Sequence, residues 1–233
     1  MVLDQVLIDA LTAVDTPTIC NALEIANGGK RSNQGFTIGV FQCAHPNMKP
    51  ILGFARTATI KTHSPYTDPP STLKARRLAF YQHMDSQGQP AIGVIQDTDD
   101  KPGTGAFWGE VHSHVLKGLG VKGVITNGSM RDFGMLAEDF QILAPVISPS
   151  HAFAQVVDVD VTVQVMGMTV NPNDLIHADR HGAVIIPISL LEKLPKSIEV
   201  VFAKERPIIE AARKTGFSFD LLKAALDVSE KIH

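Results

Sequence analysis

The sequence predicts a mixed α/β fold built around a parallel pair of strands, and three observations predict it. Two short runs rich in Ile and Val, residues 91–96 (AIGVIQ) and 123–126 (GVIT), are typical of buried strands. Between them, residues 109–119 carry apolar side chains at helical spacing, which completes a right-handed βαβ unit. Helical patterns also occupy both ends of the chain, in residues 1–30 and 189–233.

The N-terminal segment predicts two helices. Apolar residues recur at helical spacing over residues 3–14. A second helix begins at Thr16, which caps it, with Pro17 at the first helical position. This helix ends at the run Asn27-Gly28-Gly29, because glycine tolerates the left-handed backbone that terminates helices.

Two strands and a helix are predicted before the βαβ unit. Residues 35–41 and 53–62 are rich in Gly and Thr and alternate in polarity, which favours strands. Prolines then mark a loop, and residues 71–84 are expected to form a helix capped by Ser71. Residues 97–107 form a polar, Gly-containing loop within the βαβ unit.

The stretch after the βαβ unit predicts a short helix and then strands. Residues 133–140 are predicted to be helical, and residues 141–148 to be a strand. Valines at every second position make residues 156–170 one half-exposed strand. Strands at 174–178 and 181–188 follow, joined by a tight turn.

Composition and charge limit the class of protein. The chain has 21 Lys and Arg against 24 Asp and Glu, a net charge of −3, without the basic excess that a nucleic-acid surface requires. Two cysteines make no disulfide framework. The acidic N-terminus differs from a secretory signal, and no apolar run is long enough for a membrane span. We expect a cytoplasmic protein with one domain over residues 1–233 and no nucleic-acid or membrane partner.

The predicted topology brings polar side chains to one edge of the sheet. Ligands bind outside the carboxyl ends of parallel strands, where both loops of the βαβ unit emerge. The helix that starts near Gly109 has its N-terminus at the same edge, with free N–H groups and a positive dipole end that suit an anion. Glu110 lies in its first turn, and Arg131 and Asp132 approach from the next loop.

These residue types together suit a metal-assisted reaction. One carboxylate, here Asp132, is often enough to hold Mg²⁺ together with waters. The adjacent Arg131 stays charged and can stabilise a developing oxyanion, while Glu110 can position a water or move a proton. The competing interpretation is a turn that carries a surface ion pair between Arg131 and Asp132.

Two pairs of histidines have spacings that raise the question of a metal site. His112 and His114 are two apart on a helix and point in different directions, which argues against zinc. His177 and His181 are interpreted as polar turn residues among strands. A substrate contact of His177 or Arg180 stays open.

Two other features of the region have structural interpretations. Asp97, Asp99 and Asp100 are interpreted as a solvated acidic loop, with assistance to a cation as the alternative. Trp108 is expected in the core at the entry to the helix, with a place in the wall of the site as the alternative.

The segment WGEVHSHVLKGLGVKGVITNGSMRD (108–132) contains an acidic residue, twenty intervening residues and then Arg-Asp. It resembles the signature of class II pyruvate aldolases that cleave 4-hydroxy-4-methyl-2-oxoglutarate and 4-carboxy-4-hydroxy-2-oxoadipate, a family that includes the regulator of ribonuclease E activity. Residues 53–59, 105–110 and 171–187 agree, so the resemblance extends over about residues 15–190. It implies a layered α/β/β sandwich of the swivelling-domain (RraA-like) type, with the parallel βαβ unit at the active site and helices at both ends.

The resemblance also implies a role for each residue of the site. Asp132 matches the ligand of Mg²⁺ or Mn²⁺, and no organic cofactor is implied. Arg131 matches the residue that contacts the substrate's keto oxygen and steadies the enolate. Glu110 matches an acidic residue, often Asp, that orients a water for proton transfer. The turn that holds the pyruvyl carboxylate matches the backbone of Gly109, Glu110, Val111 and His112.

Assembly is part of what the resemblance implies. The family completes its site with an acidic residue from a neighbouring subunit's C-terminal region, for which Glu205 and Glu210 are candidates. We therefore expect a homotrimer or homohexamer with an intersubunit active site. The low charged fraction of 19 % fits subunit interfaces that bury apolar surface.

The function expected from the resemblance is a metal-dependent carbon–carbon lyase. It would release pyruvate from a small 4-hydroxy-2-oxo acid and decarboxylate oxaloacetate as a side activity. The rival is a non-catalytic interaction protein like the ribonuclease E regulators. Asp132 favours the enzyme, because a pure binding module has no need of a carboxylate beside an arginine at an anion site.

Overall fold

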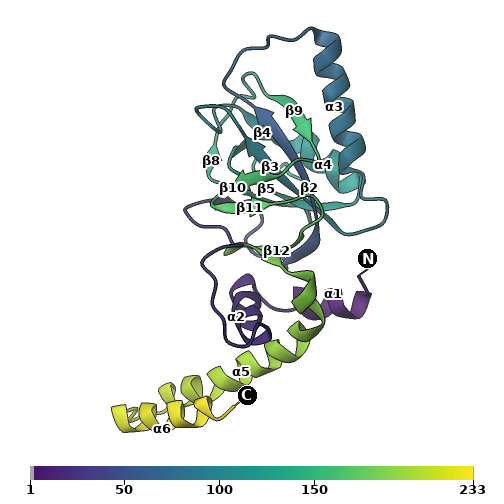
Figure 1. The fold of residues 1–233 in the computed structure, drawn as a ribbon. Helices are drawn as coiled ribbons and strands as arrows, with labels where there is room; N and C mark the ends of the chain where they lie inside the picture. The colour runs from purple at the N-terminus through teal and green to yellow at the C-terminus, as the bar shows by residue number, and fades with distance from the viewer. Residues whose placement is uncertain (1–2, 233) are drawn as a thin grey trace. The chain divides into compact units, whose positions relative to one another are not determined.

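The computed structural model describes residues 3–232 (Figure 1). The chain forms two compact units. One consists of the residues up to Thr16 together with Asn33–Pro187, and it contains the strands; the other consists of Pro17–Ser32 and the residues from Ile188 onward, and it is helical. This division into compact units does not test the expectation of one domain over residues 1–233, which stays a prediction.

A central sheet forms the body of the first unit. Its strand order is β1-β7-β5-β3-β2-β12-β13, with β9 also paired to β2. β2, β3, β5 and β7 are parallel, whereas β1, β9, β12 and β13 are antiparallel to their partners. The bounds are Gln42–Cys43 (β1), Ile51–Lys61 (β2), Ala91–Asp97 (β3), Val121–Thr126 (β5), Gln141–Ala144 (β7), Gln155–Val159 (β9), Leu175–Asp179 (β12) and Gly182–Ile186 (β13).

Two smaller sheets accompany the central one. A parallel three-stranded sheet, called the minor sheet below, has the order β4-β6-β8. β10 and β11 form an antiparallel hairpin. The bounds are Ala106–Trp108 (β4), Ser129–Met130 (β6), Val146–Ile147 (β8), Val163–Val165 (β10) and Met168–Val170 (β11).

The central sheet is covered on both faces, by helices on one and by the β10–β11 hairpin on the other (Figure 1). Ile95 of β3 packs in a cluster with Phe80 of helix α3 (Pro70–Met84) and with Leu116 of helix α4 (Glu110–Gly118). The preceding residue, Val94, belongs to a second cluster that contains the hairpin valines, because successive strand residues point to opposite faces. The predicted α/β/β layering is therefore confirmed.

The βαβ unit also matches its prediction. β3 and β5 are parallel neighbours, and α4 lies in the connection between them. The predicted hairpin after residue 174 is present as β12 and β13, which pair from Leu175 with Ile186 to Asp179 with Gly182.

Two predictions in the first half of the chain are wrong. Residues 35–41 form no strand, and only Phe36 makes an isolated bridge, to Val184. Gly35 and Gly39 have φ values of 85° and 107°, which break an extended run. Ser71 does not cap α3, which begins one residue earlier with Pro70 in its first turn and Pro69 at the cap position.

Two further corrections follow the βαβ unit. Residues 133–140 form turns rather than a helix, because Gly134 and Asp139 have positive φ and interrupt helical geometry. Residues 156–170 are three strands rather than one. The chain turns at Asp160, which has a φ of 61°, and again at Met166 and Gly167 between β10 and β11. The odd-numbered valines from 157 to 165 continue across the turn at Asp160, so their pattern gave no sign of it, whereas at the hairpin turn the buried positions change from odd to even numbers.

The second unit contains the predicted terminal helices. Helix α2 (Thr16–Ala26) starts at the boundary between the units and ends where Gly28 N–H donates to the Ile25 carbonyl and Gly29 N–H donates to the Glu24 carbonyl. After a 3-10 helix (Ile188–Lys193), α5 (Leu194–Ala212) and α6 (Phe219–Glu230) complete it. Ser218 caps α6 through a hydrogen bond from Leu221 N–H.

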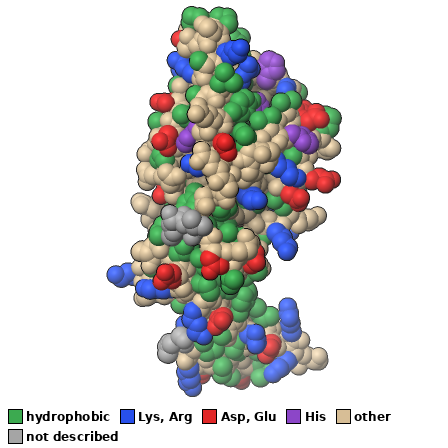
Figure 2. Space-filling view, turned by 90° about the vertical axis from the view of Figure 1, so that its right-hand side faces the viewer, with side chains coloured by type: hydrophobic (Ala, Val, Ile, Leu, Met, Phe, Trp, Pro, Cys, Tyr) green, Lys and Arg blue, Asp and Glu red, His purple; other side chains and the backbone are tan. Residues whose placement is uncertain are grey.

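The length of the helices and the distribution of surface charge can be compared with the expectation of no membrane and no nucleic-acid partner. No single helix among residues 3–232 is long and apolar enough to cross a membrane, although α1 (Gln5–Thr12) and α2 match such a span when joined across their break. On the face shown in Figure 2, acidic and basic side chains are interspersed rather than gathered by sign.

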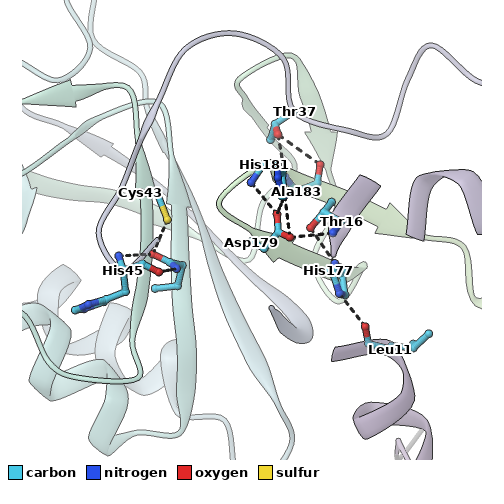
Figure 3. A network of polar contacts seen from close by, with 10 residues as sticks. Leu11, Thr16, Thr37, Cys43, His45, His177, Asp179, His181 and Ala183 are labelled. Atoms are coloured by element: carbon cyan, nitrogen blue, oxygen red, sulfur yellow. Dashed lines mark hydrogen bonds and ion pairs between the residues drawn. The ribbon is translucent and has the colours of Figure 1, made fainter. Parts of the chain in front are cut away.

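A buried polar network within the first unit joins Leu11 and Thr16 to β12 (Figure 3). His177 is fully buried in β12, where its Nδ1 meets the Thr16 hydroxyl at 3.0 Å and its Nε2 meets the Leu11 carbonyl at 3.1 Å. Asp179 Oδ2 accepts the Thr16 N–H. The prediction that Thr16 caps α2 is therefore wrong, because Thr16 is the first helical residue and its hydroxyl is directed to His177. His177 is a strand residue and not the turn residue that we expected.

The buried His177 should make stability depend on pH. Burial lowers its pKa to about 4, against about 6.5 in the unfolded chain. Between these values the unfolded state binds more protons, so stability falls as pH drops from about 6.5 to 4, by up to about 3 kcal/mol. In urea titrations, His177→Gln should remove this pH-dependent part, and the exposed control His114→Gln should keep it. Parallel losses in wild type and His177→Gln would contradict the assignment.

Candidate active site

The minor sheet brings the predicted site residues together. β4 and β6 pair in parallel, with Trp108 opposite Met130, and Arg131 N–H donates to the Trp108 carbonyl at 2.9 Å. The residues that directly follow these strands, 109–110 and 131–132, therefore lie side by side. We inferred from the central sheet that Glu110, Arg131 and Asp132 would lie together, and in the structure it is the minor sheet that brings them together.

Asp132 is the centre of the site. Its Oδ2 accepts the backbone N–H of Glu110 at 3.0 Å and lies 3.5 Å from Nε of Arg131. Arg131 also donates through Nη1 to the Pro149 carbonyl at 3.4 Å. Asp132 has a φ of 62°, a left-handed conformation that Asp and Asn tolerate better than most residues. The competing interpretation was a surface turn with an ion pair between Arg131 and Asp132. The ion pair is present, but it lies against the N-terminus of α4 and not in an isolated turn.

The N-terminus of α4 keeps donors for a ligand. Gly109 occupies the cap position, and Glu110 N–H is engaged by Asp132. Ser113 N–H donates to the Gly109 carbonyl, which leaves the N–H groups of Val111 and His112 as the first-turn donors without a partner among residues 3–232. Of the four backbone positions predicted for the carboxylate, Glu110 is thus the one whose N–H already has an acceptor, Asp132.

His112 is a neutral, packed side chain. Its ring stacks on Phe107 with centroids 4.5 Å apart, and it also contacts the rings of Tyr81 and Trp108. Burial, with the nearby charges of Arg77 and Arg131, lowers the pKa of His112 to about 4. Trp108 is fully buried, as predicted for a core residue.

The donor set suits a lightly coordinated cation. No cluster of three or more His, Cys, Asp or Glu side chains of metal-binding geometry exists within residues 3–232. Asp132 is partly exposed, and its Oδ1 has no hydrogen-bond partner in that range. Mg²⁺ is commonly held by one or two carboxylates, waters and substrate oxygens, so Asp132 fits such an ion but not zinc, which needs more protein ligands.

Two aspartates of the preceding loop are structural. Asp97 and Asp99 are both buried, so the prediction of a solvated loop is wrong for them, whereas Asp100 is exposed. Asp97 Oδ2 accepts the Thr62 hydroxyl at 2.6 Å and Gly103 N–H at 2.8 Å. These bonds tie the loop before β4 to the end of β2, and so support the strand that carries Gly109.

Asp99 should contribute measurably to stability. Burial by itself raises its pKa, but hydrogen bonds from Ser64, His63 and Thr62 outweigh it and bring the pKa to about 2. A carboxylate with a depressed pKa stabilises the fold above about pH 4 and loses this effect as pH falls toward 2. Asp99→Asn should therefore cost about 2–3 kcal/mol at pH 7 in denaturant titrations, shrinking below pH 4. The exposed neighbour gives the control Asp100→Asn, and equal effects of the two changes would contradict the role of the hydrogen bonds from Ser64, His63 and Thr62.

Some predicted candidates lie elsewhere. β12 runs antiparallel to β2, with Ala178 opposite Ile51 at the start of β2. The hairpin that carries Arg180 therefore lies at the amino-terminal edge of the parallel strands, opposite the candidate site of its own subunit, so neither His177 nor Arg180 approaches that site. Glu205 and Glu210 belong to α5 in the second unit, and Glu205 accepts a 3.5 Å hydrogen bond from Asn21.

Sequence reasoning missed the segment 148–152, which packs against β4. Ala106 N–H donates to the Ser150 carbonyl at 2.7 Å, and Pro149 supplies the carbonyl that holds Arg131. A Cβ on Gly105 would strike the His151 carbonyl. Gly105 was the signal in the sequence that could have indicated this segment, because another backbone can approach so closely only where the residue has no side chain.

Comparison with known proteins gives the family. A family model described as RraA-like (Aldolase/RraA) matches residues 16–185, which is most of the chain and includes the whole candidate site. The chain belongs to the RraA-like family. The resemblance suspected from Glu110, Arg131 and Asp132 is confirmed, and so is the family's fold.

A curated relative of this RraA-like protein matches part of the chain. An uncharacterized protein of Methanocaldococcus jannaschii is 31% identical over 107 residues, which cover 45% of this chain and 51% of that protein; the chain thus spans about half the length of this curated relative.

Solved structures share the fold. An uncharacterized protein from Pseudomonas syringae has a TM-score of 0.67 at 21% identity over 97% of this chain and 94% of that one. Streptomyces coelicolor RraAS2, described as an unusual member of the RNase ES inhibitor RraA protein family, has a TM-score of 0.63 at 21% identity over 92% and 99% of the two chains. A protein described among novel cellulases from gut-associated microbes has a TM-score of 0.71 at 16% identity over 89% and 88%. At these identities the likeness is one of fold alone.

Proposed function

We propose that this RraA-like protein is a divalent-metal-dependent lyase. It cleaves 4-hydroxy-2-oxo acids, of the 4-hydroxy-4-methyl-2-oxoglutarate or 4-carboxy-4-hydroxy-2-oxoadipate type, to pyruvate and a second oxo acid, and decarboxylates oxaloacetate at the same site. The observation that supports this proposal is the Asp132 carboxylate placed between the N-terminus of α4 and the Arg131 guanidinium.

The chain's own residues divide the work. The N–H groups of Val111 and His112, at the positive end of α4, receive the substrate carboxylate. Arg131 stabilises the negative charge that develops on the pyruvyl oxygen as the C–C bond breaks. Glu110 is exposed at the same place and orients the water that returns a proton to carbon. A divalent cation, when bound at Asp132, supplies Lewis acidity to the oxo and carboxylate oxygens.

Assembly into a homotrimer or homohexamer is part of the proposal. Several exposed apolar side chains lie close to the site residues. Some are near them in the sequence, and others belong to β8, which pairs with β6 next to Arg131. A group of exposed apolar side chains of this kind is typical of a surface that a neighbouring subunit covers. Its members are Val111, Val115, Phe133, Met135, Val146 and Ile147.

Pyruvate release tests the proposal. The purified protein is assayed with both hydroxy-oxo acids and with oxaloacetate, with Mg²⁺ or Mn²⁺ and with chelator. We expect activity only with metal, and we expect Asp132→Asn to reduce it to the chelated level, since the amide keeps the left-handed backbone but not the charge. Asp160→Asn is the matched control, because Asp160 has nearly the same φ, 61°, outside the site.

Two outcomes would contradict the proposal. Equal rates with and without chelator in wild type and Asp132→Asn would exclude the assigned site. The absence of pyruvate from all three acids, together with saturable binding of a protein partner, would favour a non-catalytic regulator instead.

A further inference from the structure

Ser113 is a fully buried polar side chain at the end of the first turn of α4. Its backbone N–H donates to the Gly109 carbonyl, and its hydroxyl donates to the Glu110 carbonyl at 2.7 Å. Ser113 is therefore bonded to the same helical turn whose N-terminus adjoins the candidate site.

The same hydroxyl reaches a second segment of the chain. Ser113 Oγ accepts the backbone N–H of Ala137 at 3.0 Å, and Ala137 is 1% exposed. A carbonyl can only accept and an N–H can only donate, so the direction of both hydrogen bonds of the hydroxyl is fixed. The Ser113 side chain thus joins the first turn of α4 to the segment that follows Asp132.

That segment has little packing of its own before it reaches Ser113. Residues 133–136 form turns with no helix, and the side chains of Phe133 and Met135 are 48% and 54% exposed. The chain is buried again only at residues 136 and 137, where the bond to Ser113 holds it. The backbone position of Asp132 therefore depends on this contact with α4.

Four hydrogen bonds close a ring through the candidate site. Glu110 N–H donates to the Asp132 carboxylate at 3.0 Å, and Met135 N–H donates to the Asp132 carbonyl at 3.0 Å. The two bonds of the Ser113 hydroxyl complete the ring. It fixes the backbone of Asp132 and its side chain against one helical turn. Groups that orient a metal ligand from behind are commonly worth about 10–100-fold in metal affinity or activity.

We propose that Ser113 is a positioning residue, whose hydroxyl holds the Asp132 carboxylate in the orientation that receives a divalent cation. This role rests on the proposed metal-dependent function, and Ser113 itself is buried and touches neither metal nor substrate. Ser113→Ala removes both hydroxyl bonds and leaves the buried Ala137 N–H without its acceptor. The turn that carries Asp132 is then free to shift.

Titration of Mn²⁺ followed by electron paramagnetic resonance tests this role without turnover. We expect Ser113→Ala to raise the dissociation constant of Mn²⁺ about tenfold or more. Ser113→Thr keeps a hydroxyl that can make the same two bonds, so it should bind Mn²⁺ more tightly than Ser113→Ala. Thermal melting checks the folding of every variant, and binding is measured well below the melting temperature of the least stable one.

Ser86→Ala is the matched control. Ser86 is also buried, but it lies at the opposite end of α4, where its N–H donates to the Leu119 carbonyl. It should keep the Mn²⁺ affinity of the wild type, even if it melts at a lower temperature. Wild-type affinity in Ser113→Ala, or an equal loss in Ser86→Ala or in Ser113→Thr, would overturn the positioning role.

Asp132→Asn in the same titration separates this role from the proposed function. If the wild type binds Mn²⁺ more tightly than Asp132→Asn and Ser113→Ala matches the wild type, the metal site stands and the positioning role alone is wrong. Equal binding by wild type and Asp132→Asn would overturn the metal site, and the role of Ser113 with it.

Discussion

Replacing Arg131 by Met should reduce the rate of pyruvate release by about 10²–10³-fold, the usual effect of losing one oxyanion-stabilising donor. The Arg131 side chain is held beside the N-terminus of α4 by the Pro149 carbonyl and by Asp132. The loss should appear in kcat more than in KM, because the stabilised charge develops only in the transition state.

Stability should change little in the same variant. The contact between Nε of Arg131 and Asp132 is 3.5 Å long and partly exposed, so it contributes less than about 1 kcal/mol. Steady-state kinetics together with thermal melting separates the two effects. Arg131→Lys should recover only part of the rate, since an ammonium lacks the planar fork. Arg180→Met, at the opposite edge of the sheet, is the control, and an equal loss of rate there would refute the assignment.

Gly109→Ala should lower the rate by about 10²-fold without adding or removing any charge. A Cβ at this position would strike Asp132 Oδ2 and approach Cγ and Nε of Arg131 at 3.2 Å. Gly109 has an extended backbone with φ −163°, which any residue adopts, so the effect is displacement of the carboxylate and not backbone strain.

A second glycine of the same helix provides the control. A Cβ on Gly118, at the last position of α4, meets no atom within 4 Å, so Gly118→Ala should keep full activity and gain slightly in helix stability. Titration of the metal dependence should show weaker activation by Mg²⁺ in Gly109→Ala only. Full activity in Gly109→Ala would mean that Asp132 does not need its present position.

The sequence predicted the parts of the fold that follow from long-range topology rules. Two Ile- and Val-rich runs with a helix between them leave one arrangement, so β3, α4 and β5 were found, and with them the common edge for Glu110 and Asp132. The minor sheet that actually sets their contact was missed. Its strands have two or three residues, too few for any periodicity to be visible.

The burial of Asp97 and Asp99 could not be predicted for a different reason. A run of acidic residues resembles solvated loops, and its side-chain hydrogen-bond donors, Thr62 and Ser64, are more than thirty residues away. His177 is similar, because its partners Leu11 and Thr16 are more than 150 residues distant in the chain. Polar residues that pair across such separations carry no local signal.

The minor sheet has a consequence for how such proteins diverge. Glu110, Arg131 and Asp132 lie just after the short strands of a sheet separate from the central one, and none of the three belongs to the apolar clusters, which take in Trp108 and Met130 of those strands. Substitutions of these three exposed or half-buried residues should therefore destabilise the scaffold little. One architecture can in this way host catalytic descendants and descendants that have lost catalysis, with the inheritance of function decided at a few replaceable positions.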